Sequence, residues 1–245
     1  MSAAAITLDG TLHYDGQPLF EDLTFEVLPE RWTCLLGPSG VGKTSLLRLI
    51  ADLPVGGEFS GTVTTTDGAS LEYRIAYMAQ SDLLAPWLNV RDNVLIGARL
   101  RDETADTRRA DDLIERVGLA GHAGKRPSEL SGGMRQRVAL ARTLMEDRPF
   151  ALLDEPFSAL DARTRADMQE LTFELLAGRT VLLVTHDPAE AVRLGHTITV
   201  MTEHGLEDFM PPALVPVRPH DNPETMQAQA ALLNLLRTGG HTCAA

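Results

Sequence analysis

The feature that most constrains this chain is a glycine-rich loop, Gly37–Thr44, set between a short apolar run and a helical pattern. The run at 33–36 predicts a buried strand, and residues 44–51 predict a helix. Glycines in such a loop let the backbone wrap around phosphate oxygens, and successive N–H groups then face the anion. Lys43 is expected to reach the β- and γ-phosphates, and the Thr44 hydroxyl to ligate Mg²⁺. The expected nucleotide contacts are Gly37, Pro38, Ser39, Gly40, Val41, Gly42, Lys43, Thr44 and Ser45.

The alternative explanation of this loop is a glycine-rich strand–helix turn with an incidental lysine. Lysine is rare in the chain: of 22 basic residues, only Lys43 and Lys125 are lysines. A lysine at this particular spacing therefore favours the phosphate-binding interpretation.

Strand-like and helical patterns alternate along the chain, and several strands are apolar on both faces, which predicts an α/β fold with a largely parallel sheet. Residues 91–147 read as mostly helical, with breaks near 118–124 and at Arg126-Pro127. The predicted strands are 5–12, 21–28, 33–36, 61–66, 75–79, 150–153, 180–185 and 196–202, and further helices are predicted at 164–177 and 188–194.

Composition excludes several classes of protein. The chain has 245 residues, 44% of them hydrophobic and 23% charged, which is typical of a globular protein rather than a disordered one. Its net charge of −12 argues against a nonspecific grip on nucleic acid or on anionic membranes. Cys34 and Cys243 have neither disulfide-framework nor zinc spacing, and Cys34 is expected to be a small buried residue. With neither a long apolar span nor a secretion signal in view, the expected compartment is the cytoplasm.

Two carboxylates follow the apolar run 150–153, as Asp154-Glu155-Pro156. A carboxylate at the tip of a buried parallel strand projects into the crevice where such sheets bind ligands. Asp154 is then placed to hold Mg²⁺, and Glu155 to face the γ-phosphate and polarise the attacking water. A solvated turn at the end of a strand is the alternative, but the phosphate loop shifts the balance toward a nucleotide site.

A second glycine-rich helix start lies at Leu130–Arg137. Met134, Val138, Ala141 and Met145 recur at helical spacing in and after it, which predicts a single core-facing stripe.

The two glycines of this helix start need an explanation of their own. Ser131 alone would serve as an N-cap, and Gly132 and Gly133 lower the helix propensity. Exposed N–H groups at a helix N-terminus would form a second anion site. Because the first loop already surrounds its own phosphates, we infer that this helix start closes over a nucleotide held by another copy of the chain.

Over roughly residues 5–205, the chain resembles the ATP-binding cassette (ABC) family of transport ATPases. The resemblance rests on four segments in this order: Gly37–Thr44, Leu130–Arg137, Leu153–Pro156 and Ser158–Asp161. We call Leu130–Arg137 the signature segment. The resemblance implies a P-loop NTPase fold with a RecA-like core, an antiparallel β subdomain and an α-helical subdomain.

The resemblance also implies a domain organisation. Residues 1–205 would form the nucleotide-binding domain, with the helical subdomain at about 85–145. Residues 206–245 would form a C-terminal tail, proline-rich at first and then carrying a short helix. Asn222 as N-cap and Pro223 at the first position predict where that helix begins.

By the same resemblance, four more residues gain roles. Gln80 resembles the glutamine that touches Mg²⁺ and senses the transport partner, and His186 the switch histidine that contacts the γ-phosphate. Asp161 resembles the aspartate that links the two sites across a dimer. Tyr14 occupies the place of the aromatic that stacks on adenine, the alternative being an ordinary packing residue.

Two positions depart from the family pattern. Met134 stands where many members have glutamine, which bears on the contacts of the signature segment. Glu30 stands where a glycine is common just before the phosphate-loop strand, and we expect this change to concern a turn.

A finer resemblance is carried by residues 81–95, Met134 and Glu146–Pro149. These segments resemble importers of the nitrate, sulfonate and taurine type and their relatives that import pyrimidine precursors of thiamine. Of the two, the resemblance favours the pyrimidine-precursor branch. The architecture implies ATP and Mg²⁺ as ligands, a homodimer on ATP binding, transmembrane permease subunits and, indirectly, a periplasmic or lipoprotein solute-binding protein. No nucleic acid is expected. The chain would lie on the cytoplasmic side of the inner membrane, peripheral through the permease.

The apolar segment Leu83–Leu88 follows Gln80 closely and contains Trp87. It is expected to receive a helix of the permease, since tryptophan is a common interface anchor. The alternative is an edge of the core.

Two competing functions use the same phosphate loop. A non-transport cassette ATPase of DNA repair or translation would normally carry a long coiled-coil insertion or two cassettes, and this chain has neither. A GTPase or small-molecule kinase would not need the signature segment or His186. The sequence therefore favours the motor subunit of an importer.

Overall fold

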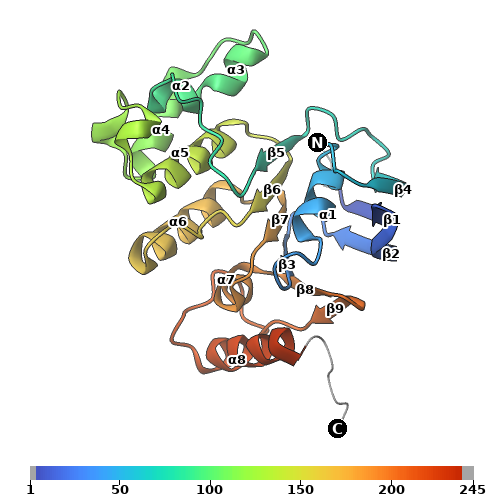
Figure 1. Ribbon diagram of the computed structural model, residues 1–245. Coiled ribbons are helices and arrows are strands. Elements are labelled where there is room, and N and C mark those ends of the chain that lie inside the picture. The colour runs from blue at the N-terminus through green and yellow to red at the C-terminus, as the bar shows by residue number, and fades with distance from the viewer. Residues whose placement is uncertain (1–3, 239–245) are drawn as a thin grey trace.

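A six-stranded central sheet organises the computed structural model, which describes residues 4–238. The strand order is β5-β6-β7-β3-β8-β9, parallel except for β9, which pairs antiparallel with β8 (Figure 1). This confirms the predicted α/β fold with a largely parallel sheet. The strands are β3 (Trp32–Leu36), β5 (Ile75–Met78), β6 (Phe150–Asp154), β7 (Thr180–Val184), β8 (Thr197–Thr202) and β9 (Gly205–Phe209).

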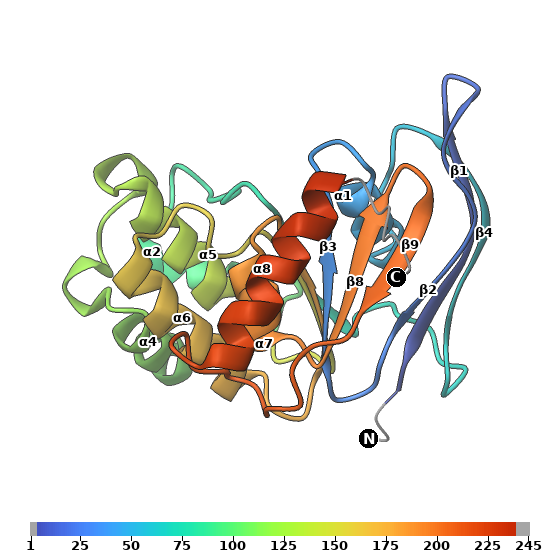
Figure 2. The same ribbon diagram turned by 90° about the horizontal axis from the view of Figure 1, so that it is seen from below.

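A second sheet is antiparallel and three-stranded, in the order β2-β1-β4. Its strands are β1 (Ile6–Tyr14), β2 (Gln17–Val27) and β4 (Glu58–Thr65). Figure 2 shows this sheet at one end of the molecule and the helices α2, α4 and α5 at the other, with the central sheet between them. The antiparallel β subdomain and the helical subdomain expected from the sequence are thus both present.

Short helices fill the region between β5 and β6, as the helical pattern at 91–147 predicts. The helices are α2 (Val90–Val94), α3 (Ile96–Leu100), α4 (Thr107–Arg116) and α5 (Gly132–Met145), with 3₁₀ turns at Ala120–His122 and Pro127–Glu129. Those turns lie at or beside the predicted breaks. On α5, Val138 and Ala141 of the predicted stripe are buried, while Met134 and Met145 are half-buried against the same core.

The alternating side chains of the central strands divide the core into two layers. Leu152 of β6 and Leu182 of β7 belong to the layer that α1 (Lys43–Ile50) and the antiparallel sheet cover. Their neighbours Leu153 and Leu183 belong to the opposite layer, under α5, α6 (Ala162–Leu175) and α7 (Pro188–Leu194). Because successive residues of a strand point to opposite faces and both faces are covered here, β6 and β7 are apolar on both faces.

The C-terminal part differs from the sequence prediction in two respects. The expected tail begins at 206, yet β9 spans Gly205–Phe209 and extends the central sheet. The sequence pattern did not predict β9, because this strand is largely polar. Backbone hydrogen bonds to β8 hold β9 at the edge of the sheet, so it needs no apolar pattern of its own. The division of the chain near residue 205 stays a prediction.

The second difference is the helix α8 (Pro223–Thr238), which has 16 residues and is not short. Asn222 caps it, since its side-chain oxygen accepts from the backbone N–H of Glu224 at 2.9 Å, as predicted. Ala228, Leu232 and Leu235 bury one stripe of α8 in the core layer beneath α7.

Two expectations from composition can be placed on the structure. Cys34 is fully buried on β3, and burial raises the pKa of its thiol, so it is the inert core residue expected. Cys243 lies outside the described residues. Within residues 4–238, no helix has the length and apolar character needed to span a bilayer.

Candidate functional site

The carboxyl ends of four neighbouring strands bring the predicted polar residues together. β5, β6, β7 and β3 lie side by side in parallel, so the loops after them meet at one edge of the sheet. Gln80 follows β5, Glu155 follows β6, His186 follows β7 and the phosphate loop follows β3. This is the edge at which open parallel sheets bind ligands.

The phosphate loop leads from β3 directly into α1. A Cβ at Gly37 would collide with the carbonyl oxygen of Met201 on β8, so the loop can leave the sheet here only with glycine. Gly42 has φ 114° at the N-cap of α1, again outside the range of ordinary residues. The glycines therefore allow the tight path that a phosphate cradle needs.

Lys43 is only 7% exposed, and its ammonium donates to the carbonyl oxygens of Gly37 and Pro38, both at 2.8 Å. Burial lowers the pKa of Lys43, partly offset by the charges of Glu155 and Asp154. The phosphate loop thus encloses the Lys43 ammonium group.

Thr44 and Asp154 form an oxygen-donor pair suited to a divalent cation. The Thr44 hydroxyl donates to Asp154 Oδ2 at 3.0 Å, although the two residues are far apart in sequence. Asp154 is 1% exposed, and burial raises the pKa of its carboxyl, opposed by the Thr44 hydrogen bond. A buried carboxylate beside a hydroxyl is the donor set that Mg²⁺ accepts, so these residues fit the predicted ion.

The carboxylate of Glu155 contacts two further predicted residues, Gln80 and His186. Gln80 donates from Nε2 to Glu155 Oε2 at 3.2 Å, and His186 Nδ1 lies 3.1 Å from Glu155 Oε1. The Glu155 side chain is 16% exposed and the His186 side chain 58% exposed. One carboxylate therefore carries a contact from the loops after both β5 and β7, while remaining open to solvent on the histidine side.

Tyr14 lies beside the phosphate loop. Its hydroxyl is 3.2 Å from the Ser45 hydroxyl, which places the end of β1 next to the first turn of α1. An aromatic ring in this place is compatible with the predicted adenine contact, which stays a prediction.

The helix start Ser131–Gly133 of the signature segment lies apart from the phosphate loop. Ser131 caps α5 by accepting from the Met134 N–H at 3.2 Å, and the N–H groups of Gly132 and Gly133 have no partner among the described residues. Within residues 4–238, no hydrogen bond or ion pair joins this helix start to the phosphate loop. The chain by itself leaves the second predicted anion site facing outward.

Asp161 caps the helix α6, since its side chain accepts from the Thr164 N–H at 3.1 Å. These local hydrogen bonds lower the pKa of Asp161. The residue has a structural role within the chain, and its predicted role across a dimer stays a prediction.

The family model for ABC transporters matches residues 20–158, more than half of the chain. The chain belongs to the ABC transporter family.

Several relatives of this ABC protein are named after imported solutes. An aliphatic sulfonates import ATP-binding protein of Rhodococcus jostii is 47% identical over 79% of this chain and 77% of its own length. A sulfonates import protein of Delftia acidovorans is 40% identical over 96% of this chain and 95% of its own. A taurine import ATP-binding protein of Yersinia pestis is 40% identical over 77% and 76%.

A solved structure supports the fold of the ABC protein. It is the dimeric, post-hydrolysis state of the ATP-binding cassette MJ0796 bound to ADP and Pi, with a TM-score of 0.72 and 25% identity over 87% of this chain and 99% of that one. The chain is therefore an ATP-binding ATPase whose hydrolysis is coupled to transport.

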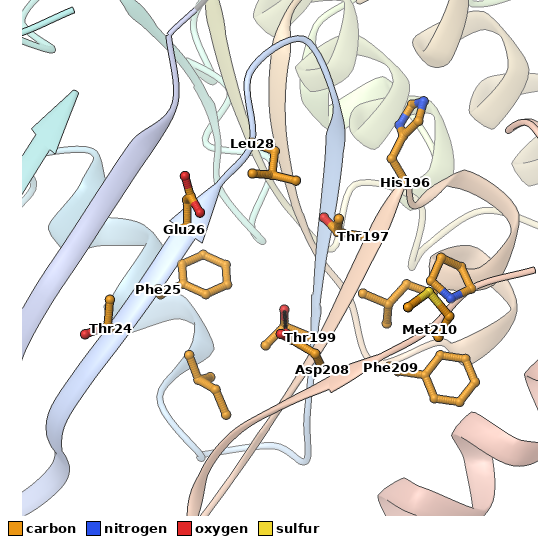
Figure 3. A pocket seen from close by; sticks show the side chains of 13 residues that line it. Thr24, Phe25, Glu26, Leu28, His196, Thr197, Thr199, Asp208, Phe209 and Met210 are labelled. Atoms are coloured by element: carbon orange, nitrogen blue, oxygen red, sulfur yellow. Dashed lines mark hydrogen bonds between the residues drawn. The ribbon is translucent and has the colours of Figure 1, made fainter. Parts of the chain in front are cut away.

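A pocket of about 550 Å³ lies elsewhere on the ABC protein, between β2 and the β8–β9 hairpin (Figure 3). Phe25 and Leu28 line one side and Thr199 and Phe209 the other. None of the predicted nucleotide residues is part of its lining.

Sequence reasoning missed the residues around His186, the predicted switch histidine. Thr185, just before His186, donates to the buried Glu190 at 2.7 Å. Burial raises the pKa of Glu190 to about 7, opposed by the Thr185 hydrogen bond. Arg165 on α6 donates to the Leu160 carbonyl at 3.0 Å and lies 3.5 Å from Asp187.

Gln136 on α5 was also missed, although it is 6% exposed and donates to the Glu155 carbonyl at 3.0 Å. A sequence signal existed, because Gln136 begins a second stripe on α5 with Leu140 and Leu144, and a polar residue on an apolar face needs a partner.

Proposed function

We propose that this chain is the ATP-hydrolysing subunit of an importer for a small organic or anionic solute of the sulfonate or taurine type. The observation that carries the ATPase mechanism is the double contact of Gln80 and His186 on Glu155, next to the Thr44–Asp154 pair. The solute class is supported by the names of the relatives from Rhodococcus jostii, Delftia acidovorans and Yersinia pestis. The pyrimidine-precursor branch stays a prediction of the sequence. A role in DNA repair or translation has no support among these relatives.

In the proposed mechanism, the loop Gly37–Ser45 surrounds the phosphates of ATP and Tyr14 contacts the base. Lys43, already inside the loop, exchanges its carbonyl partners for phosphate oxygens, which are stronger acceptors. Thr44, Asp154 and Gln80 are the residues that would hold Mg²⁺. The ion would neutralise charge on the β- and γ-phosphates.

Glu155 would act as the general base on the attacking water, and His186 would contact the γ-phosphate. Glu155 is suited to this work because two side chains orient its carboxylate and one edge stays open to solvent. The hydrogen bond from Gln80 ties the same carboxylate to the segment that follows, Ser81–Leu88. A displacement of that segment by a partner would therefore reach the base directly.

The site is completed by a second copy of the chain. Ser131, Gly132 and Gly133 would face the γ-phosphate held by the partner copy, and Asp161 would approach the dimer interface. The support is the outward-facing, unpartnered N–H groups at the start of α5, because such a helix end attracts an anion. The solved structural neighbour is itself dimeric.

The permease would contact the segment Leu83–Leu88. Leu83 is 64% and Trp87 71% exposed, whereas Leu84 and Ala85 between them are buried. The buried Asn93 holds the segment from below: its Nδ2 donates to the Ala85 carbonyl at 3.2 Å, and its Oδ1 accepts from the Ala85 N–H at 2.8 Å. A rigid segment with an exposed aromatic residue is a good interface anchor. The chain would thus lie on the cytoplasmic side of the inner membrane, with a solute-binding protein on the other side.

The Glu155→Gln variant tests the ATPase mechanism. It should bind MgATP but lose turnover by about three orders of magnitude, as removal of a general base predicts, and it should accumulate as an ATP-bound dimer in sedimentation velocity. Glu203→Gln, on the exposed turn between β8 and β9, is the matched control and should behave as wild type. A Glu155→Gln chain that stays monomeric at saturating MgATP would contradict the shared site.

The solute class needs a separate experiment. If a solute-binding protein is encoded beside this chain, that protein, purified with its natural ligand, should release a sulfonate or a related anion detectable by mass spectrometry. A pyrimidine in its place would support the other branch.

A further inference from the structure

Glu155 holds an unusual backbone conformation. Its φ of 48° lies in the left-handed region, which costs a residue with a Cβ on the order of 1 kcal/mol or more and persists only where neighbours enforce it. The Glu155 N–H donates to the Val184 carbonyl on β7 at 2.9 Å. Its carbonyl oxygen accepts from Gln136 Nε2 and from the Ser158 hydroxyl, both at 3.0 Å. The Ser158 N–H also donates to the Glu155 carbonyl, at 3.3 Å. These four bonds fix the peptide groups on both sides of the proposed base.

Gln136 makes every one of its side-chain hydrogen bonds to the turn that begins at Glu155. Besides the Glu155 carbonyl, its Nε2 lies 3.2 Å from the Ser158 hydroxyl, and its Oε1 accepts from the Ala159 N–H at 2.7 Å. The residue is 6% exposed, so these bonds are not exchanged for water. A single planar amide therefore clamps both ends of the turn 155–159.

The clamp joins this turn to the start of the signature helix. Gln136 lies one turn after Ser131 and Gly133 on α5. A Cβ at Gly133 would lie 3.1 Å from the Ala159 carbonyl oxygen, so the helix start packs closely on the same turn. Any shift of α5 along its axis must move the backbone of Glu155 with it.

We propose that Gln136 is a positioning residue for catalysis: its amide clamp sets the carboxylate of Glu155 and couples it to the helix start that faces the partner copy's nucleotide. This inference rests on the proposed function, in which Glu155 is the base. One chain then serves two nucleotides, with Glu155 at its own and Ser131–Gly133 at the other, and Gln136 is the mechanical link between them.

The test uses the full chain with Gln136→Met, which keeps the volume and removes the hydrogen bonds. We expect kcat for ATP to fall by about 100-fold, the loss that a misplaced catalytic group can cause, with KM and equilibrium ATP binding within about twofold. Gln169→Met is the matched control. Gln169 is 2% exposed on α6, where it accepts from Arg193, so its loss removes an equally buried glutamine away from the site.

A double variant separates positioning from general damage. If Gln136 acts through Glu155, then adding Gln136→Met to Glu155→Gln should leave the residual rate unchanged. A further fall by the same factor as in the wild-type background would overturn the proposal, as would a Gln136→Met kcat equal to wild type. If Glu155→Gln itself retained turnover, the proposed function would fail instead.

A milder variant keeps the test decisive if Gln136→Met lowers the melting temperature below the assay temperature. Ser158→Ala removes the hydroxyl that donates to the Glu155 carbonyl and accepts from Gln136 Nε2. It keeps the hydrogen bond from Gln136 to the Glu155 carbonyl and the one from the Ala159 N–H to Gln136. It should lower kcat by several-fold at unchanged KM, and it should also have no effect in the Glu155→Gln background. A wild-type kcat for Ser158→Ala, together with an unfolded Gln136→Met, would count against the inference.

Discussion

Two helices of this ABC protein begin at glycines, α1 at the phosphate loop and α5 at the signature segment, and within residues 4–238 only the first region has its polar groups partnered. At the strand tips, Lys43, Thr44 and Glu155 already have partners within the chain. At the start of α5, Gly132 and Gly133 expose N–H groups that the described residues do not satisfy. The difference supports the proposal that the first region binds ATP and holds the base, whereas the second acts only when a partner copy supplies the anion.

The largest effect should come from breaking the complete region. Lys43→Met removes the ammonium that would donate to the phosphate oxygens, so ATP affinity should fall by about 100-fold or more. The thermal stabilisation that wild type shows on adding MgATP should then disappear at the same ATP concentration. The natural control is Lys125→Met, since Lys125 is the other lysine of the chain. An ATP-induced shift equal to that of wild type would show that the loop does not hold the triphosphate.

The second prediction breaks the incomplete region. Ser131→Arg should leave ATP binding by the chain within about twofold, because no hydrogen bond among residues 4–238 joins this position to its own phosphate loop. Turnover should fall on the order of 100-fold, the effect of losing a transition-state donor, and the ATP-dependent dimer of the Glu155→Gln background should be lost.

A matched variant accounts for the lost helix cap. Asp106→Arg removes the N-cap of α4, whose side chain accepts from the Arg109 N–H at 2.9 Å. Each cap is worth about 1 kcal/mol of stability, so both variants should lose a similar few degrees in melting temperature. If Asp106→Arg impaired turnover as much as Ser131→Arg, the loss would reflect stability rather than the second nucleotide site.

The smallest effect concerns the segment Leu83–Leu88, which lies outside both glycine-led helix starts. Trp87→Ala should weaken permease association by about 2 kcal/mol, as for an aromatic interface anchor, and leave the ATPase activity of the isolated chain within about twofold. Tyr73→Ala is the control, because Tyr73 and Trp87 are both 71% exposed aromatic residues. Equal recovery of the permease with Trp87→Ala and wild type in a pull-down would refute the contact.

Much of the candidate site was predictable because its chemistry is local. The loop Gly37–Thr44 combines strand, glycines and helix within one short stretch, and its residues lie where the spacing predicts. Asp154 follows a strand that is apolar on both faces, so its place at the sheet edge could also be foreseen. Even the departure at Glu30 agrees, since its φ of 54° lies in the region that favours glycine in a turn.

The residues that sequence reasoning missed act over long sequence separations. Gln136 was visible as part of the signature segment, but its partner is a backbone carbonyl on another element. Arg165 on α6 lies 3.5 Å from Asp187, next to His186, although the two residues are far apart in sequence. Backbone acceptors leave no trace in residue type, so such contacts require the packed structure.

The amino-acid sequence by itself determined the type of fold, the phosphate loop, the acidic strand tip and the capped helix starts, because each depends on propensities and spacings within a few residues. Only the tertiary structure decided that Gln80 and His186 both contact the carboxylate of Glu155, that β9 joins the central sheet, and that α8 runs for 16 residues. The physical reason is that the first two features depend on the spatial order β5-β6-β7-β3-β8-β9, and the third on the packing of α8 against α7. That order places side by side strands that the chain keeps far apart, and its stability comes from packing summed over the whole core.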